Sequence, residues 1–120
     1  MRKLVELDEV TWHFKEIDPK KLQRVGHIFR DWLFQIDPAQ DKFGFLKQDL
    51  PLVEAALSGQ LELPYRGYRP HGWELGEGLL SMEYREISAP FYNAIRGAHL
   101  GVPKIIEKDG RRYAWLEFED

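Results

Sequence analysis

Two short stretches of the chain alternate between apolar and polar residues. Residues 9–17 put Val10, Trp12 and Phe14 on one side of an extended chain and polar residues on the other. Residues 80–84 repeat the pattern with apolar side chains at every second position. A two-residue period is typical of a strand with one buried face. The pattern therefore predicts a strand in each stretch.

A long helix is predicted between Asp18 and Ile36, where apolar residues recur every three or four positions. Asp18 is a typical N-cap and the following Pro19 suits the first helical turn. Asp37 precedes a proline and should end the helix. Gly26 lies within the apolar stripe, so another element is expected to approach the helix closely there. The apolar stripe consists of Leu22, Val25, Gly26, Phe29, Trp32, Leu33 and Ile36.

Two shorter helices are also predicted. The first spans Asp49 to Gly59, with Asp49 as its cap, Pro51 in its first turn and Gly59 as its stop. The second opens at Ser88, in the sequence Ser-Ala-Pro. Its end is predicted at Gly97, Gly101 and Pro103.

The C-terminal region predicts a β-hairpin. Asp109-Gly110 separates two apolar runs, residues 104–108 and 111–118, and favours a two-residue type I′ turn. The last run is apolar on both faces, so its strand should be central in the sheet or meet a partner. The predicted fold class is α+β, with an antiparallel sheet, helices packed on one face and the order β-α-α-β-α-β-β. Residues 1–120 are expected to form a single globular domain.

Composition narrows the function classes. The chain has 120 residues, a formal net charge of −3, a pI near 5.8 and no cysteine. The lack of cysteine excludes disulfides, thiol catalysis and cysteine-ligated metals. No phosphate-binding, dinucleotide, zinc-helix or calcium-loop motif occurs, so no catalytic residue, metal or cofactor is predicted. The acidic balance argues against nucleic-acid binding. No apolar run is long enough for a membrane span or signal peptide, which predicts a cytoplasmic protein with no membrane partner.

The most unusual segment is Pro64 to Gly78, which holds four glycines, two prolines, three aromatic residues, two arginines and a histidine. Tyrosine, tryptophan and arginine often dominate interface energies, and proline and glycine can preset a loop for docking. Tyr68 and Trp73 should be exposed if this loop binds a partner and buried if it only plugs the fold. The predicted partner-binding residues are Tyr65, Arg66, Tyr68, Arg69, His71, Trp73, Glu74 and Glu77.

The favoured hypothesis is a small acidic protein-binding module. Its specific form is an immunity-type inhibitor that binds and neutralises a bacterial toxin, in particular a basic nuclease. The hypothesis rests on size, acidity and the lack of catalytic motifs, which is an analogy and not a motif match. The sequence does not determine the oligomeric state.

Two alternatives come from the same loop. A small hydrolase or phosphotransfer enzyme would use His71 as general acid or base, with Arg66 and Arg69 holding an anion. This alternative requires the three side chains to converge in one pocket. A single-stranded nucleic-acid binder would instead stack bases on aromatic side chains and contact phosphates with the two arginines. The stacking residues would be Tyr65, Tyr68 and Trp73.

Overall fold

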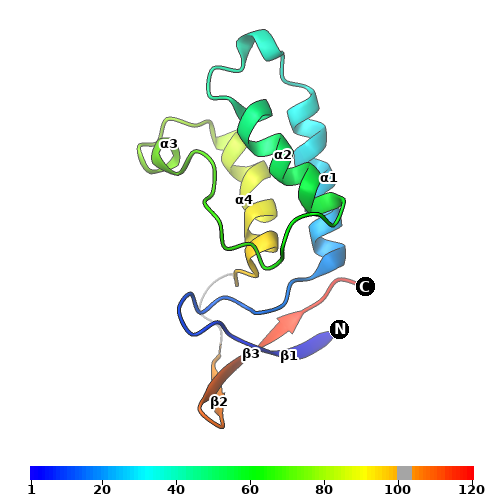
Figure 1. Ribbon diagram of the computed structural model, residues 1–120, viewed down its shortest axis with the longest axis vertical. Coiled ribbons are helices and arrows are strands. Elements are labelled where there is room, and N and C mark those ends of the chain that lie inside the picture. The colour runs from blue at the N-terminus through cyan, green and yellow to red at the C-terminus, as the bar shows by residue number, and fades with distance from the viewer. Residues whose placement is uncertain (100–103) are drawn as a thin grey trace.

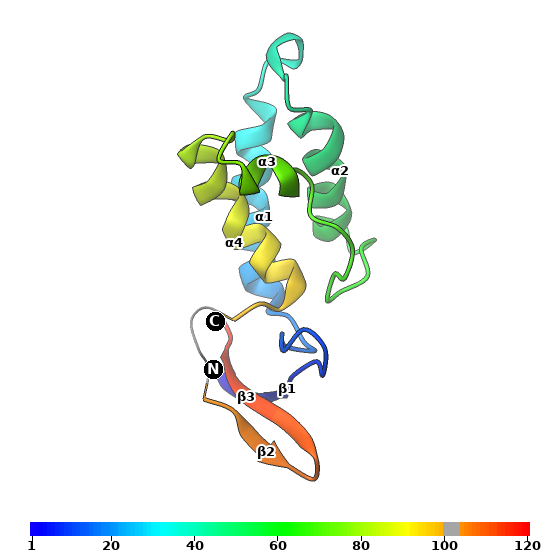
Figure 2. The same cartoon turned by 90° about the vertical axis from the view of Figure 1, so that its left-hand side faces the viewer.

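Helices and a small sheet occupy opposite ends of an elongated molecule in the computed structural model, which describes residues 1–99 and 104–120 (Figure 1). The molecule measures 54 × 31 × 22 Å along its principal axes. Its two termini lie close together beside the sheet (Figure 2). The α+β fold class and the antiparallel sheet predicted from the sequence are confirmed. The elements are β1 (Arg2–Glu6), α1 (Pro19–Phe34), the 3₁₀ turn η1 (Pro38–Gln40), α2 (Phe45–Leu57), α3 (Gly72–Gly76), α4 (Met82–Arg96), β2 (Ile106–Lys108) and β3 (Arg111–Glu117).

The long helix α1 is confirmed, including its cap. The Asp18 side chain accepts hydrogen bonds from the first-turn amides of Lys20 and Lys21, at 3.1 and 3.2 Å. The end of α2 comes close to α1 at Gly26, because a Cβ on Gly26 would lie 2.7 Å from Leu57 Cδ2. The glycine therefore permits the close approach that its place in the stripe predicted.

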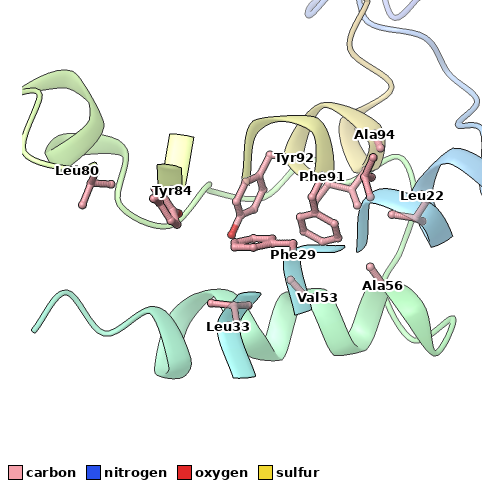
Figure 3. Close-up of a cluster of buried hydrophobic side chains, with 12 residues drawn as sticks. Leu22, Phe29, Leu33, Val53, Ala56, Leu80, Tyr84, Phe91, Tyr92 and Ala94 are labelled. Atoms are coloured by element: carbon pink, nitrogen blue, oxygen red, sulfur yellow. The ribbon is translucent and has the colours of Figure 1, made fainter. Parts of the chain in front are cut away.

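The main core lies between α1, α2 and α4, and Figure 3 shows its side chains interleaving from the three helices. Phe29 of α1 sits among the aromatic rings, 5.6 Å from the Phe91 ring and 6.1 Å from the Tyr84 ring between centroids. Each large apolar side chain that is fully buried contributes about 1.5–3 kcal/mol to stability. The buried members are Leu22, Val25, Phe29, Leu33, Val53, Ala56, Leu80, Tyr84, Phe91, Tyr92, Ala94 and Ile95.

The sheet has the order β1-β3-β2 with both pairs antiparallel. The last strand, β3, is therefore central, which is one of the two arrangements that its two apolar faces predicted. Asp109 and Gly110 both have positive φ, 54° and 76°, which fits the predicted type I′ turn and confirms the hairpin. Val5 of β1 pairs with Ala114 of β3. A second, smaller hydrophobic cluster forms here from Val5, Leu7, Phe14 and Ala114.

The strand predicted over residues 9–17 is wrong. The Asp8 side chain accepts hydrogen bonds from the amides of Val10 and Thr11, at 2.8 and 3.0 Å, and so closes a turn where the pattern suggested extended chain. Trp12 has a φ of 62° inside this turn, and Phe14 forms an isolated bridge to Leu7. The first strand of the sheet is β1.

The strand predicted over residues 80–84 is also wrong, and the helix predicted from Ser88 starts earlier. α4 begins at Met82, capped by Ser81, whose Oγ accepts a hydrogen bond from the Tyr84 amide at 3.2 Å. Its end at Gly97, with φ 68°, is confirmed. The sequence also predicts that Gly101 and Pro103 help to end this helix, and these two residues lie outside the described residues.

The second predicted helix exists but starts before Asp49. α2 begins at Phe45, and Asp41 caps it by accepting hydrogen bonds from the amides of Phe45 and Leu46, both at 2.9 Å. Asp49 is fully buried instead of capping, and Pro51 lies inside the helix. The helix ends at Leu57, just before Gly59, which confirms the predicted stop. Across residues 1–99 and 104–120, no helix has the length and apolar character needed to cross a bilayer.

Candidate functional site

The segment 64–78 crosses the helical end of the molecule from α2 to α3 and leads on to α4 (Figure 1). Its start is tied to α4 by a 2.7 Å hydrogen bond from the Tyr65 amide to the Ile95 carbonyl. Its side chains then divide between the core and the solvent. Tyr68 is 96% exposed and Trp73 is 69% exposed, whereas His71 is buried at 5%. One part of the loop is therefore fixed to the core, and another part is exposed to solvent.

The anchor is a buried polar cluster built around Asp49. His71 Nε2 lies 2.8 Å from Asp49 Oδ2. The Tyr84 hydroxyl donates to Asp49 Oδ1 at 3.0 Å, and the Tyr92 hydroxyl donates to the same oxygen. Asp49 comes from α2, the two tyrosines from α4 and His71 from the loop. One carboxylate therefore joins three segments of the chain.

Burial dominates the electrostatics of this cluster. It raises the pKa of Asp49 above its ordinary value, although hydrogen bonds from Tyr92 and Tyr84 and the proximity of His71 act in the opposite direction. Burial, followed by the nearby Asp49 charge, also raises the pKa of Tyr84 and of Tyr92. Both hydroxyls consequently keep their protons across the physiological range and remain donors to Asp49.

Aromatic rings enclose the same anchor. The Phe45 ring stacks on Tyr84, with centroids 4.5 Å apart, and meets the His71 ring edge-on at 5.0 Å. His71 has a φ of 63°, a left-handed conformation that costs about 1–2 kcal/mol in a residue other than glycine. Its buried hydrogen bond to Asp49 and its ring contacts offset this cost and hold the backbone turn at the start of α3.

The two arginines of the loop also contact the protein itself. Arg69 Nη2 donates to Ser88 Oγ at 3.0 Å, and its guanidinium lies 4.6 Å from the centre of the Tyr92 ring. Arg66 Nη1 donates to the Arg96 carbonyl at 2.7 Å, at the C-terminal end of α4. Arg69 therefore belongs to the anchor, whereas Arg66 braces the loop against the far end of α4.

This placement bears on the enzyme alternative. The enzyme alternative requires the side chains of His71, Arg66 and Arg69 to lie in one accessible pocket. The His71 side chain is fully buried, and Arg66 contacts the C-terminal end of α4, whereas Arg69 contacts Ser88 in the middle of that helix. The structure does not bring the three side chains together around a space that a substrate could enter.

The outer side of the segment carries the other predicted contact residues. Glu77 is exposed, Glu74 and Tyr65 are half-buried, and the Tyr65 hydroxyl donates to the Tyr68 carbonyl at 2.9 Å. Large exposed apolar side chains follow in the same stretch of chain. They are Trp73, Leu79 and Met82.

Asp49, Tyr84, Tyr92 and Ser88 were not among the residues that the sequence singled out for the site. A signal for Asp49 does exist, because Asp49, Val53 and Ala56 are all buried and recur at the helical spacing. A carboxylate in the apolar stripe of a helix must find buried donors. The sequence could therefore have marked Asp49 as a polar anchor, but not its partners.

No group of three or more histidine, cysteine or acidic residues placed to hold a metal ion occurs in the part of the chain that the structure describes. No family model matches the chain, and neither a curated protein nor a solved structure matches it significantly.

Proposed function

We propose that the chain is a protein-binding module whose contact surface is centred on Tyr68 and Trp73. One observation carries this proposal. Both aromatic side chains project into solvent, while their sequence neighbours are held inside the protein: His71 is buried against Asp49, and half-buried Arg69 donates to the buried Ser88. Exposed aromatic residues on a preset loop lose little conformational freedom on docking, which favours binding.

The charge around this surface indicates the kind of partner. Glu77, Glu83 and Glu86 are exposed along the same stretch, and Glu74 is half-exposed. The three arginines of the same stretch each donate to other groups of the protein: Arg66 to the Arg96 carbonyl, Arg69 to Ser88 Oγ and Arg85 to the Leu75 carbonyl. We propose a basic partner, and within that class a bacterial toxin such as a nuclease, which the chain would neutralise as an immunity-type inhibitor. An acidic, aromatic surface is suited to cover a cationic active site.

The proposal is tested by affinity purification of the tagged full chain from its cell of origin. We expect a basic protein to co-elute in stoichiometric amount with the wild type. Tyr68→Ala with Trp73→Ala should weaken the complex by at least about 2 kcal/mol, roughly thirtyfold, because central aromatic residues dominate such interfaces. The free energy of unfolding should change by less than about 0.5 kcal/mol, because both side chains are exposed.

Trp115→Ala is the matched control, since Trp115 is an exposed tryptophan on the sheet, away from the loop. It should leave partner binding unchanged. Equal loss of binding in the control and the loop variant would contradict the proposed surface, as would full binding by the loop variant.

The basic character of the partner has a kinetic test of its own. Association of oppositely charged proteins is accelerated by electrostatic steering, and added salt screens it. The association rate of the purified pair should therefore fall steeply as the salt concentration rises. A slow rate that does not depend on salt would contradict a basic partner but not the contact surface.

A further inference from the structure

A small hollow lies between the N-terminal turn, the start of the 64–78 segment and the end of α4. Its volume is about 180 Å³, less than the roughly 300–1,000 Å³ of pockets for drug-sized ligands. It can therefore take a small ion or chemical group but not a large organic molecule. The residues that line it are Thr11, His13, Tyr65, Arg66, Gly67 and Arg96.

Two arginines, Arg66 and Arg96, line this hollow and are held in place by hydrogen bonds to backbone carbonyls. Arg66 Nη1 donates to the Arg96 carbonyl at 2.7 Å, and Arg96 Nη2 donates to the Gly67 carbonyl at 3.3 Å. Arg66 Nη2 also reaches the Phe14 carbonyl at 3.4 Å. A guanidinium carries five N–H donors, so these contacts with the backbone leave further donors on both side chains. Both guanidinium groups are therefore held in position and still have N–H groups that can donate to a ligand.

Positive charge exceeds negative charge around the hollow. Asp8 is the carboxylate beside it, with Oδ2 3.9 Å from Arg66 Nε, and its Oδ1 already accepts from the amides of Val10 and Thr11. Burial lowers the pKa of His13, and the charges of Arg66, His99 and Arg96 lower it further, with Asp8 acting against them. In a chain with a formal net charge of −3, this is a local reversal of sign.

We propose that this hollow binds a small tetrahedral oxyanion, a phosphate or sulfate group, between the guanidinium groups of Arg66 and Arg96. Planar guanidinium forks match the spacing of oxyanion oxygens and can donate two hydrogen bonds at once. Tyr68 and Trp73 are not among the residues that line the hollow, and the anion proposal does not depend on the partner proposed for them.

The test is a titration of the full-length protein with sodium sulfate, at constant ionic strength maintained with chloride, followed by NMR. Saturable shifts should appear in the His13 ring and in the amides of residues 11–13 and 65–67. Arg96→Gln should weaken sulfate binding at least about tenfold, and Arg96→Lys, which keeps the charge but loses the fork, should weaken it less. The two variants together keep the test valid if one of them fails to fold.

Arg2→Gln is the matched control, because Arg2 is exposed on the sheet and pairs with Glu117 at 3.7 Å. It should bind sulfate like the wild type. Shifts that do not saturate, or that are the same in Arg96→Gln and Arg96→Lys as in the wild type, would show general screening by ions and overturn the proposal.

The pH dependence gives an independent readout. Sulfate keeps its charge around neutral pH, so any change in its affinity there comes from the protein. A bound anion favours the protonated imidazole, so it should raise the pKa of His13, which also faces Arg66, Arg96, His99 and Asp8. By linkage, sulfate affinity should rise as pH falls through the His13 pKa. An affinity that is constant or falls over this range would overturn the place of the anion beside His13.

Two further probes distinguish the source of the anion. Inorganic phosphate and glycerol 1-phosphate carry the same group, but the second has an organic remainder. Similar affinities would indicate a free anion, and tighter binding of glycerol 1-phosphate would indicate a phosphorylated ligand. Binding of neither probe would overturn the proposal.

Discussion

Asp49 illustrates how much one residue can organise in this protein. Its carboxylate is fully buried in α2, yet it accepts hydrogen bonds from two tyrosines of α4 and lies 2.8 Å from His71 Nε2 in the loop. A buried charge is costly unless its hydrogen bonds are satisfied, and here they also determine where the loop docks. The display of Tyr68 and Trp73 therefore depends on a carboxylate that does not itself reach the surface.

Replacing Asp49 should test this role directly. Asp49→Ala leaves His71, Tyr84 and Tyr92 without their shared acceptor, so the free energy of unfolding should fall by about 3–5 kcal/mol. Urea unfolding provides the measurement. Asp31→Ala, at an exposed position of α1, should change it by less than about 0.5 kcal/mol. Similar losses in both variants would contradict the anchor role.

The pH dependence of stability should carry the signature of the same carboxyl. Burial raises the pKa of Asp49 above its ordinary value of 3.8, so the folded protein retains this proton at pH values where the unfolded chain has lost it. The stabilising contribution is then complete below pH 3.8 and is lost as pH rises through the raised pKa. The difference in unfolding free energy between wild type and Asp49→Ala should shrink over that range. A difference that grows with pH would contradict a raised pKa.

At the scale of elements, local signals succeeded where the chain carries strong caps and turns. α1 has an aspartate cap, a proline in its first turn and a long apolar stripe, and the hairpin has Asp109-Gly110. These preferences act within a few residues, so they do not depend on the rest of the fold. The stretch over residues 80–84 carries only a brief alternation, and Leu80 and Tyr84 are four residues apart, which suits one face of a helix equally well.

The start of α4 depends on Ser81, which gives a test at this scale. Ser81→Ala removes the side-chain acceptor for the Tyr84 amide and should lower the free energy of unfolding by about 1 kcal/mol. Ser58→Ala is the control, because Ser58 follows α2 and its hydroxyl donates to the Ala55 carbonyl at an exposed site. It should cost less than about 0.5 kcal/mol in the same denaturant titration. A larger loss of unfolding free energy in Ser58→Ala than in Ser81→Ala would contradict the capping role of Ser81.

At the scale of the whole molecule, the helical core and the sheet cluster are separate, and polar contacts join them. The Phe14 amide donates to the Gly97 carbonyl at 2.8 Å. The Glu119 amide donates to Asp18 Oδ2 at 2.7 Å, and the Glu119 carboxylate accepts from Arg24 Nη2 at 2.6 Å. The capping residues of α1 and α4, Asp18 and Gly97, therefore also connect the helical core to the sheet cluster.

Gly97 is a tightly packed link between the helical core and the sheet cluster. It has a φ of 68°, and an added Cβ would lie 2.6 Å from the Phe14 carbonyl oxygen. Gly97→Ala should therefore lower the free energy of unfolding by about 3 kcal/mol, through the left-handed backbone and the clash together. Gly59→Ala has a similar φ of 78° but no described atom within 4 Å of the new Cβ, so about 1 kcal/mol is expected. Equal losses measured by urea unfolding would contradict a tight junction at Gly97.

The amino-acid sequence alone was sufficient for the α+β class, helix α1, the hairpin and the unusual character of segment 64–78. These depend on periodicity, caps and turn residues, which act over short distances. Only the tertiary structure showed that His71 and Arg69 turn inward while Tyr68 and Trp73 turn outward. That division depends on Asp49 and Ser88, about 20 residues away along the chain in either direction, and no local preference of a loop specifies such distant partners.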